Sequence, residues 1–593
     1  MKSSQNPKDM SRRKFMALAG GAAGLATMAA MGLLPEQGAC SPNLPEIDID
    51  KMTYAENKAD VLVIGGGMAG LFAAVKAHDA GSKVILVSKG RLGSSGQTPF
   101  AKGIFAFDPS SAKISLDEFV ESVSRSALGT NNPVYTRQMA EHSLARVNEL
   151  KQWGFFESPL YNKCFNTPIK ERNIPVKERI VITHLIKGKG QIAGAAGFSL
   201  DEEKIHFFRA KIVILCTGAG SFKPNGFPIC DLTHDGTVMA YNIGAKVTGK
   251  EWNDGHHGQA ENAAACFEGW HGMFERKPGI TGVGIRHDLG VDLNYQAYMN
   301  GNPIKMGPPG TGGGKEAEGG PYVPDEFKRN GPPKGERGPG EGHGPRGDAG
   351  PRGGGPPKKG GAPPGMAGTL VGGSSAGMSI HKSEGLVPIN EKCESNIPGL
   401  YAAGDALGSY MAGAIYTQIG SSLAGSAVQG AVAGKAAAEY CQGVEMPIIS
   451  KVKMNDVQAE ILAPLKREVG YGPAWVTQTL QSIMIPNFII YIKKESLLKA
   501  ALAYVEELRD HHMPMLRAAN LHELRLAFET ANMIVSAEMK LKASLMRKES
   551  RCSHFRLDYP EMDTKTWNAW INIYKGNDGK MKFEKQPFDN WPS

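Results

Sequence analysis

The sequence lacks several patterns that would assign it to other functional classes. Its eight cysteines are scattered and form neither C-x-x-C nor C-x-x-C-H, so no motif points to an iron–sulfur cluster, a c-type haem, a zinc site or a disulfide framework. Beyond residue 40, no apolar run reaches the roughly 20 residues that a membrane-spanning helix needs. The net charge is only +8 and the basic residues are spread along the chain, which argues against a nucleic-acid-binding surface.

Length and composition favour a large multidomain protein. The chain has 593 residues, of which 41% are hydrophobic, enough for roughly three or four domains with cores of their own. Glycine (74) and proline (37) are in excess, and much of the excess lies in residues 302–366. The glycine register there breaks too often for a collagen triple helix. We expect an exposed, flexible or polyproline-like insertion, either a tolerated loop expansion or a segment that contacts a partner.

The N-terminus resembles an export signal. Residues 11–16 read Ser-Arg-Arg-Lys-Phe-Met, a twin-arginine motif, and a weakly hydrophobic Gly/Ala-rich stretch follows to residue 34. This pattern predicts a signal peptide over residues 1–40, export of the folded protein, and a periplasmic or extracytoplasmic location without an integral membrane span in the mature chain. The alternative is a chance arginine pair before a hydrophobic helix. Cys40 follows a poor lipobox, so a lipid anchor is the less favoured interpretation.

Residues 60–70 (Asp-Val-Leu-Val-Ile-Gly-Gly-Gly-Met-Ala-Gly) are typical of a dinucleotide-binding turn. An apolar run predicts a buried parallel strand, and residues 71–77 predict a helix directly after it. Gly65 permits the tight turn, Gly67 lets the backbone approach a pyrophosphate, and Gly70 lets helix and strand pack closely. The unpaired N–H groups at the start of the helix would then face the phosphates. The alternative is a glycine-rich turn that holds no ligand.

The rest of the chain alternates strands and helices. The apolar patterns predict strands at residues 84–87, 180–186, 191–197 and 211–220, helices at 133–154, 496–511 and 521–547, and an edge strand at 567–574.

Several motifs together resemble one family. They are Thr-Gly-Ala-Gly at residues 217–220, Gly-Leu-Tyr-Ala-Ala-Gly-Asp-Ala at 399–406, Leu-Thr-His-Asp-Gly at 232–236, Ser88-Lys89 at the end of the second strand, and Arg-Lys-Glu-Ser-Arg-Cys-Ser-His-Phe-Arg at 547–556. The set resembles the FAD-binding flavoproteins of fumarate reductase and succinate dehydrogenase, including adenylylsulfate reductase. The resemblance covers about residues 58–300 and 368–585.

The resemblance implies an α/β fold: a Rossmann-like FAD domain of the two-dinucleotide-binding type, an inserted α+β capping domain and a C-terminal helical domain. The expected boundaries are 58–250 for the first part of the FAD domain, 251–370 for the capping domain, 371–445 for the second part of the FAD domain and 446–593 for the helical domain and tail. Arg551, His554 and Arg556 are expected to hold this last region to the flavin domain.

The resemblance also implies the residues that bind FAD. They are Gly65, Gly67, Met68, Ala69, Gly70, Ser88, Lys89, Gly96, Gly218, Asp235, Gly404, Asp405, Ser421 and Leu423. Asp405 would accept hydrogen bonds from flavin ribityl hydroxyls, or else serve only as a turn residue. Ser421 and Leu423 begin a helix whose N-terminus would face the flavin pyrimidine. Family members with covalent FAD carry a histidine where this chain has Gly96, so we expect FAD to be bound non-covalently.

Four residues are candidates for the reaction, again by resemblance. His256 matches a substrate-contacting histidine, and Arg286 with Asp288 matches an arginine that donates a proton while flavin N5 delivers hydride. An arginine, with an ordinary pKa near 13, is a poor acid without a carboxylate relay. Tyr416 lies near the position of the family's carboxylate-clamping arginine, which suggests a less anionic substrate than fumarate. For each residue the alternative is structural: a loop histidine, a surface arginine, or a tyrosine that packs on the flavin.

These features predict an exported FAD-dependent oxidoreductase that reduces an activated C=C bond of a small-molecule substrate. Because the chain has no cluster or haem motif, we expect an iron–sulfur or cytochrome partner to supply electrons. The alternatives are chemistry like that of adenylylsulfate reductase, an oxidative dehydrogenase, and a flavin electron-carrier subunit without substrate chemistry.

Overall fold

The computed structural model describes residues 47, 49–223, 229, 231–253, 258–259, 275–283, 370–371, 384–414, 417–418, 420–490 and 492–589. The predicted signal peptide and the Gly/Pro-rich insertion lie outside these residues.

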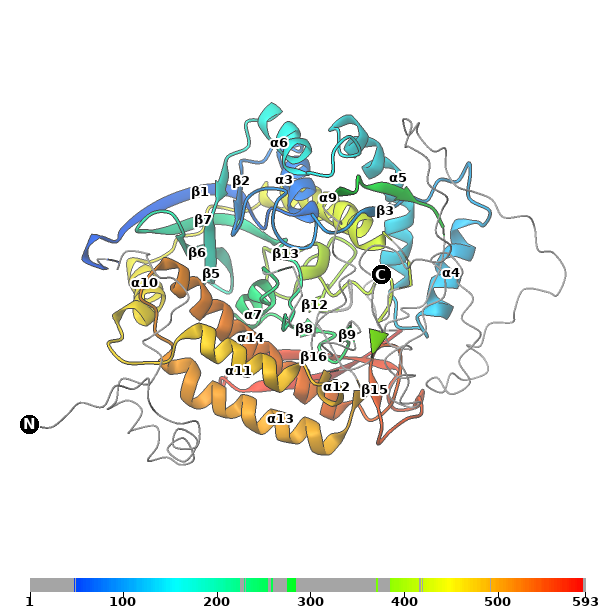
Figure 1. The fold of residues 1–593 in the computed structure, drawn as a ribbon. Helices are drawn as coiled ribbons and strands as arrows, with labels where there is room; N and C mark the ends of the chain where they lie inside the picture. Colours follow the sequence, from blue (N-terminus) through cyan, green and yellow to red (C-terminus); the bar gives the residue numbers. More distant parts are fainter. Residues whose placement is uncertain are drawn as a thin grey trace, which may run out of the picture.

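A seven-stranded sheet lies at the centre of the described fold (Figure 1). Its strands are β1 (Thr53–Ile64), β2 (Val84–Ser88), β4 (Val176–Glu178), β5 (Ile180–Gly188), β6 (Gln191–Ser199), β7 (Lys204–Leu215) and β13 (Leu400–Ala402). Their order is β4-β2-β1-β7-β6-β5, with β13 also paired to β7. The pairs β2–β4, β1–β2, β1–β7 and β7–β13 are parallel, whereas β5, β6 and β7 form an antiparallel meander. The predicted strands at 84–87, 180–186 and 191–197 are confirmed within this sheet. The strand predicted at 211–220 is β7, which begins earlier, at Lys204, and ends at Leu215.

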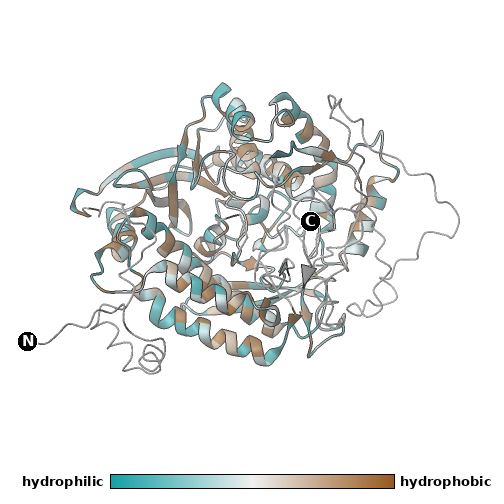
Figure 2. Ribbon diagram, viewed as in Figure 1, coloured by the Kyte–Doolittle hydropathy of each residue, from teal (hydrophilic) through white to brown (hydrophobic). Residues whose placement is uncertain are grey.

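The parallel part of the sheet is buried because its strands are apolar on both faces. Residues 61–64 of β1 are all buried, as expected for a strand covered on two sides. Helix α3 (Met68–Asp79) follows β1 and leads to β2, so the predicted strand–turn–helix–strand unit is confirmed. In Figure 2 brown, the colour of hydrophobic residues, marks the inner part of this sheet, whereas the outer end of β1 is teal.

Helix α9 (Ser421–Cys441) packs directly on α3 through small residues. A Cβ on Gly430 would lie 2.2 Å from the carbonyl oxygen of Ala69, and one on Gly434 would lie 2.4 Å from that of Ala73. These two glycines are four residues apart and therefore share one face of the helix. The contact brings a segment more than 300 residues later in the chain against the first strand–turn–helix unit.

Four further helices surround the sheet: α4 (Leu116–Ser126), α5 (Pro133–Gln152), α6 (Asn162–Glu171) and α7 (Asp235–Asn242). Helix α5 confirms the prediction at residues 133–154. It begins at Pro133 because the Asn132 side chain accepts a hydrogen bond from the amide of Val134, and proline suits the first helical position.

The C-terminal region is helical up to residue 546. It contains α10 (Lys451–Lys466), α11 (Pro473–Met484), α12 (Asn487–Ile490), α13 (Glu495–Glu507) and α14 (Leu521–Met546), so both predicted helices are confirmed. Helices α11, α13 and α14 share an apolar core and lie side by side in Figure 1. Figure 2 shows hydrophobic and hydrophilic residues alternating along them, as in amphipathic helices. None of the helices in the described ranges is both long enough and apolar enough to span a membrane.

A second sheet joins the chain's tail to the middle of the sequence. Its antiparallel order is β12 (Gly385–Leu386), β8 (Val247–Thr248), β16 (Ala569–Lys575) and β17 (Met581–Pro587). The prediction of an edge strand at residues 567–574 is therefore wrong in one respect. β16 pairs on both sides, with β8 and with β17, so it is an interior strand. Residues 569–573 are all buried, so both faces of the strand are covered.

Three short pairs complete the description: β3 (Gly103–Phe105) with β10 (Gly279–Thr281), β9 (Gly258–Gln259) with β11 (Leu370–Val371), and β14 (Ile492–Lys493) with β15 (Phe555–Arg556). The five cysteines among the described residues are buried, unbridged thiols: Cys164, Cys216, Cys393, Cys441 and Cys552.

Candidate functional site

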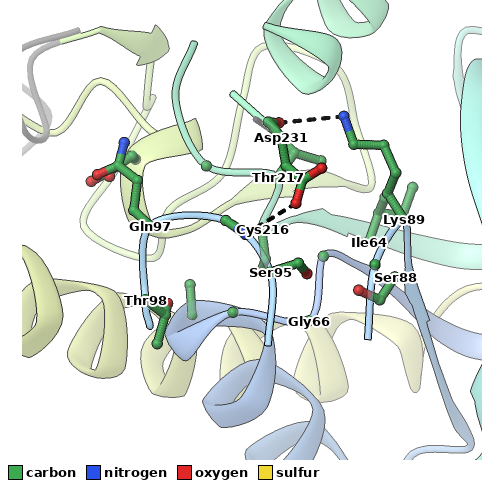
Figure 3. A pocket seen from close by; sticks show the side chains of 18 of the residues that line it. Ile64, Gly66, Ser88, Lys89, Ser95, Gln97, Thr98, Cys216, Thr217 and Asp231 are labelled. Atoms are coloured by element: carbon green, nitrogen blue, oxygen red, sulfur yellow. Dashed lines mark hydrogen bonds between the residues drawn. The ribbon is translucent and has the colours of Figure 1, made fainter. Parts of the chain in front are cut away.

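A cavity lies where β1, β2 and β7 end (Figure 3). Its lining combines the turn after β1, the end of β2, the loop at residues 95–98, the turn after β7 and the residues after β13. The carboxyl ends of parallel strands are where such sheets bind ligands. The cavity therefore lies where the sequence places a dinucleotide.

The glycines of the first turn are required by their contacts. Gly65 has a φ of +117°, and a Cβ there would lie 2.1 Å from the carbonyl oxygen of Cys216. A Cβ on Gly70 would lie 1.8 Å from the carbonyl oxygen of Gly65. At these two positions β1, β7 and α3 lie so close together that no side chain fits. Helix α3 then starts at Met68, whose amide donates to the Thr98 hydroxyl at 3.2 Å.

The opposite wall is open and polar. Gly96 and Gly218 both have a φ of +71°, and nothing lies within 4 Å of where their Cβ atoms would be. Thr217 lines the cavity between them, and its buried hydroxyl has no hydrogen-bond partner among the described residues. A buried hydroxyl is costly without a partner. The wall thus offers both room and a hydrogen-bonding group to a polar ligand.

Asp405 enters the cavity from the short turn Gly404–Ala406. Gly404 has a φ of +72°, and its amide donates to the Gln429 side chain at 3.1 Å. Gln429 belongs to α9, so the helix that packs on α3 also fixes the turn that carries Asp405.

Most of the predicted FAD-binding residues line this cavity: Gly65, Gly67, Met68, Ala69, Ser88, Lys89, Gly96, Gly218, Asp235, Gly404 and Asp405. Three do not. Gly70 packs on Gly65, the Ser421 hydroxyl donates to the carbonyl oxygen of Gln418 at 2.8 Å, and Leu423 is buried in the main core. Sequence reasoning missed the apolar part of the lining, Ile180, Ile182 and Met239, because isolated apolar residues carry no motif.

The four reaction candidates His256, Arg286, Asp288 and Tyr416 lie outside the described residues. The structure does describe residues close to them in sequence, and some of these residues contact one another. The Gln418 side chain, two residues after Tyr416, donates to the carbonyl oxygen of Gly282 at 3.2 Å, four residues before Arg286. Trp252 and Ala414, which precede His256 and Tyr416, belong to one buried cluster.

These neighbouring segments also reach the cavity loop. β10, which leads toward Arg286, pairs with β3, which follows the cavity loop of residues 95–98. The amide of Phe105 in β3 donates to the carbonyl oxygen of Gly420 at 3.1 Å, directly before α9. The described segments next to Arg286 and Tyr416 therefore contact each other and β3, the strand that follows the cavity loop.

A buried ionic cluster that the sequence did not indicate lies behind the cavity wall. Both Lys250 and Lys540 approach the Glu384 carboxylate to 2.5 Å, and His234 Nδ1 lies 3.2 Å from it. Burial raises the pKa of Glu384, but the two lysines outweigh it and hold the pKa well below its ordinary value. Burial lowers the pKa of His234 to about 4, against the opposing effect of Glu384. The only sequence signal was His234 itself, which takes a φ of +61° where the family motif has glycine.

Arg551 and Arg556 are structural residues, but they do not act mainly as predicted: their ion pairs lie within the C-terminal region, and only Arg551 also donates to an earlier segment, the carbonyl oxygen of Leu128 at 3.5 Å. Arg556 is buried and pairs with Asp558 at 2.8 Å, and Arg551 pairs with Glu549 at 3.1 Å. His554 Nδ1 accepts a hydrogen bond from the buried Lys493 Nζ at 2.8 Å, and Lys493 Nζ also donates to the carbonyl oxygen of Glu251.

The residues present fit FAD. A glycine turn and helix start can hold a pyrophosphate, Ile180, Ile182 and Met239 give an apolar wall for an adenine ring, and the Asp405 carboxylate and the Thr217 hydroxyl can bind ligand hydroxyls. When bound, FAD supplies two-electron chemistry at its flavin ring.

Comparisons with known proteins agree with this geometry. Residues 60–162 match the family described as FAD binding domain, and residues 477–592 match the family described as Fumarate reductase flavoprotein C-term. An uncharacterized FAD-dependent oxidoreductase of Methanocaldococcus jannaschii is 26% identical, covering 89% of this chain and 98% of that protein. A fumarate reductase (CoM/CoB) subunit of Methanothermobacter marburgensis is 24% identical, covering 85% and 95%. The structure of adenylylsulfate reductase from Archaeoglobus fulgidus matches with a TM-score of 0.68 at 19% identity, covering 92% and 98%.

The fold and the cavity thus define a flavoprotein that uses FAD. More narrowly, the chain is an FAD-dependent oxidoreductase that is similar to the flavoproteins of fumarate reductase.

Proposed function

We propose that this protein reduces an activated carbon–carbon double bond in a small-molecule substrate. FAD would supply the electron pair as hydride, and a side chain of this protein would supply the proton. The observation that carries the proposal is that the described segments next to Arg286 and Tyr416 contact each other and β3, which follows the cavity loop, while Trp252, before His256, shares a buried cluster with Ala414. The near full-length match to a protein named as a fumarate reductase subunit supports it.

Each candidate has a distinct role in this proposal. Arg286 donates the proton, and Asp288 relays a proton back to it, because a guanidinium is a weak acid alone. A fixed guanidinium also stabilises the negative charge that develops on the substrate in a water-poor site. His256 and Tyr416 orient the substrate. The family's carboxylate-clamping arginine falls at about Tyr416 or Thr417 in this chain, and its loss favours an enone or a mono-anionic enoate over a dicarboxylate.

The experiment is anaerobic reoxidation of the reduced holoprotein by a panel of enones, enoates and sulfur oxyanions, followed by flavin absorbance. Rapid reoxidation by an alkene supports the proposal. Reoxidation by sulfur oxyanions alone would favour chemistry like that of adenylylsulfate reductase, and response to artificial acceptors alone would favour the oxidative or electron-carrier alternatives.

A matched pair of variants sharpens this experiment. R286A should lower alkene-dependent reoxidation about 10²- to 10³-fold while FAD stays bound, since it removes a donor to the transition state. R276A is the control, because Arg276 is exposed in the same region of the chain. Equal rates for the two variants would contradict a catalytic role for Arg286.

We also propose that FAD is held non-covalently. Gly96 occupies the position of the covalent histidine in the family, and among the described residues that line the cavity none is a histidine. Acid precipitation should release all the flavin into the supernatant, whereas flavin retained in the pellet would contradict the proposal.

Electron supply and export are further proposals. An iron–sulfur or cytochrome partner would deliver the electrons, consistent with the relative that is named as a subunit. Co-purification under native promoters, with reduction of the flavin by the isolated partner, would test this.

The export proposal has its own test. The first 40 residues fused to a reporter should direct it out of the cytoplasm, and replacing Arg12 and Arg13 by lysine should stop export.

A further inference from the structure

The cavity wall is tied to the C-terminal helix α14 through Asp231. The amide of Gly96 donates to Asp231 Oδ2 at 3.4 Å, and Arg525 Nη2 of α14 donates to Oδ1 of the same carboxylate at 3.4 Å. Gly96 and Asp231 both line the cavity. Figure 3 shows Asp231 and Lys89 in contact at the rim.

Lys89, the residue after β2, makes the second connection. Its Nζ donates to Asp235 at 2.8 Å and to Glu529 of α14 at 2.7 Å. The Glu529 side chain is only 4% exposed. Burial alone lowers the pKa of Lys89, but the carboxylates of Asp235 and Glu529 outweigh it and raise the pKa above its ordinary value. Lys89 is therefore a fixed cation whose position depends on a carboxylate from another domain.

Asp235 makes the third connection. Its Oδ1 accepts from the Asn532 amide of α14 at 2.8 Å, while Oδ2 accepts from Lys89. Arg525, Glu529 and Asn532 are spaced by four and three residues, so they lie on one face of α14. None of the three lines the cavity, but each holds a residue that does.

We propose that Arg525, Glu529 and Asn532 form an α14 clamp that sets FAD affinity by positioning Asp231, Lys89 and Asp235. They are positioning residues, because they act through the cavity wall. Helix α14 would thus contribute to the cofactor site as well as to the packing of the C-terminal region. Substitutions in the clamp remove charged hydrogen bonds that hold Asp231, Lys89 and Asp235 in position. FAD then dissociates faster, while the α14 helix remains folded.

The test uses the full-length protein, freed of FAD and reconstituted. E529Q keeps the shape of the side chain but removes its charge, and should raise the Kd for FAD by at least about tenfold, mainly through faster dissociation. The matched control is E538Q, a buried glutamate of the same helix that pairs with Arg509 and Lys542, away from the cavity. FAD fluorescence gives both the Kd and the dissociation rate constant.

A second background shows whether Glu529 acts through Lys89. In a K89M protein, E529Q should change the Kd for FAD much less than it does in the natural chain. An unchanged Kd for E529Q would overturn the proposal. An equal loss of FAD affinity in E529Q and E538Q would also overturn it, because it would show only general destabilisation of α14.

Discussion

The guanidinium of Arg547 binds one carboxylate oxygen of Glu251: Nε lies 2.9 Å and Nη2 2.8 Å from Oε1. The two residues are 296 positions apart, and both side chains are at most 1% exposed. Arg547 also pairs with Glu549 at 2.8 Å and donates to the carbonyl oxygens of Trp567 and Ala569. One side chain thus joins the C-terminal signature to the segment that leads to His256.

The first prediction concerns this arginine. R547K keeps the charge but removes the planar fork, leaving buried carboxylate and carbonyl oxygens without donors. We expect a loss of about 3 kcal/mol in the free energy of unfolding, as for a broken buried pair. Urea denaturation measures it, with R137K as the control, because Arg137 forms only exposed ion pairs. A loss equal to that of the control would show that the fork is dispensable.

Stability should fall in mild acid because of His234. Its folded pKa is about 4, below its ordinary value of 6.5, so the unfolded chain binds more protons between these values. Stability is therefore full above pH 6.5 and declines as the pH falls toward 4, by about 3 kcal/mol in total.

The variant H234N tests this assignment, since asparagine tolerates the left-handed backbone at this position. It should flatten the pH dependence of the melting temperature between pH 6.5 and 4.5. An unchanged slope would assign the effect to other groups, such as His554, whose pKa burial and nearby cations also hold well below its ordinary value.

Asp405 should control FAD affinity. Removing its carboxylate in D405A takes away a charged hydrogen-bond acceptor from the cavity, a change of about 1.5–3 kcal/mol or roughly 10- to 100-fold in Kd. Equilibrium titration of the apoprotein with FAD gives this value. D578N is a suitable control, since Asp578 does not line the cavity and forms an exposed pair with Lys582 and a hydrogen bond with the Lys580 amide. Native affinity in D405A would mean that this residue only shapes its turn.

The contact between α9 and α3 gives a packing prediction. G434A places a methyl group 2.4 Å from the carbonyl oxygen of Ala73, so the helices must separate. We expect a loss of about 1–3 kcal/mol, the usual range for overpacking, although alanine favours helix. G443A, where a Cβ meets nothing closer than 4.0 Å, is the control for urea denaturation. A stabilised G434A protein would contradict this account of the contact.

The sequence predicted the strand and helix elements of the flavin domain well because their signals are local. The glycines at 65 and 70 are forced by contacts between neighbouring elements, so a short motif records them. Ser421 and Leu423 illustrate the limit of such reasoning. Their motif predicted a helix start correctly, but the hydrogen bond of Ser421 to Gln418 and the burial of Leu423 depend on packing that no motif records.

The sequence by itself determined the dinucleotide turn, the alternation of strands and helices, and the family resemblance, since each rests on residues close together in the chain. Tertiary structure alone decided that β16 is an interior strand, that Glu384 holds two lysines, and that α14 reaches Lys89 and Asp235. Those partners are 130 or more residues apart, and a charged side chain carries no mark of the distant charge that it meets. These charged groups are buried only in the folded chain, and a buried charge needs a partner of opposite charge.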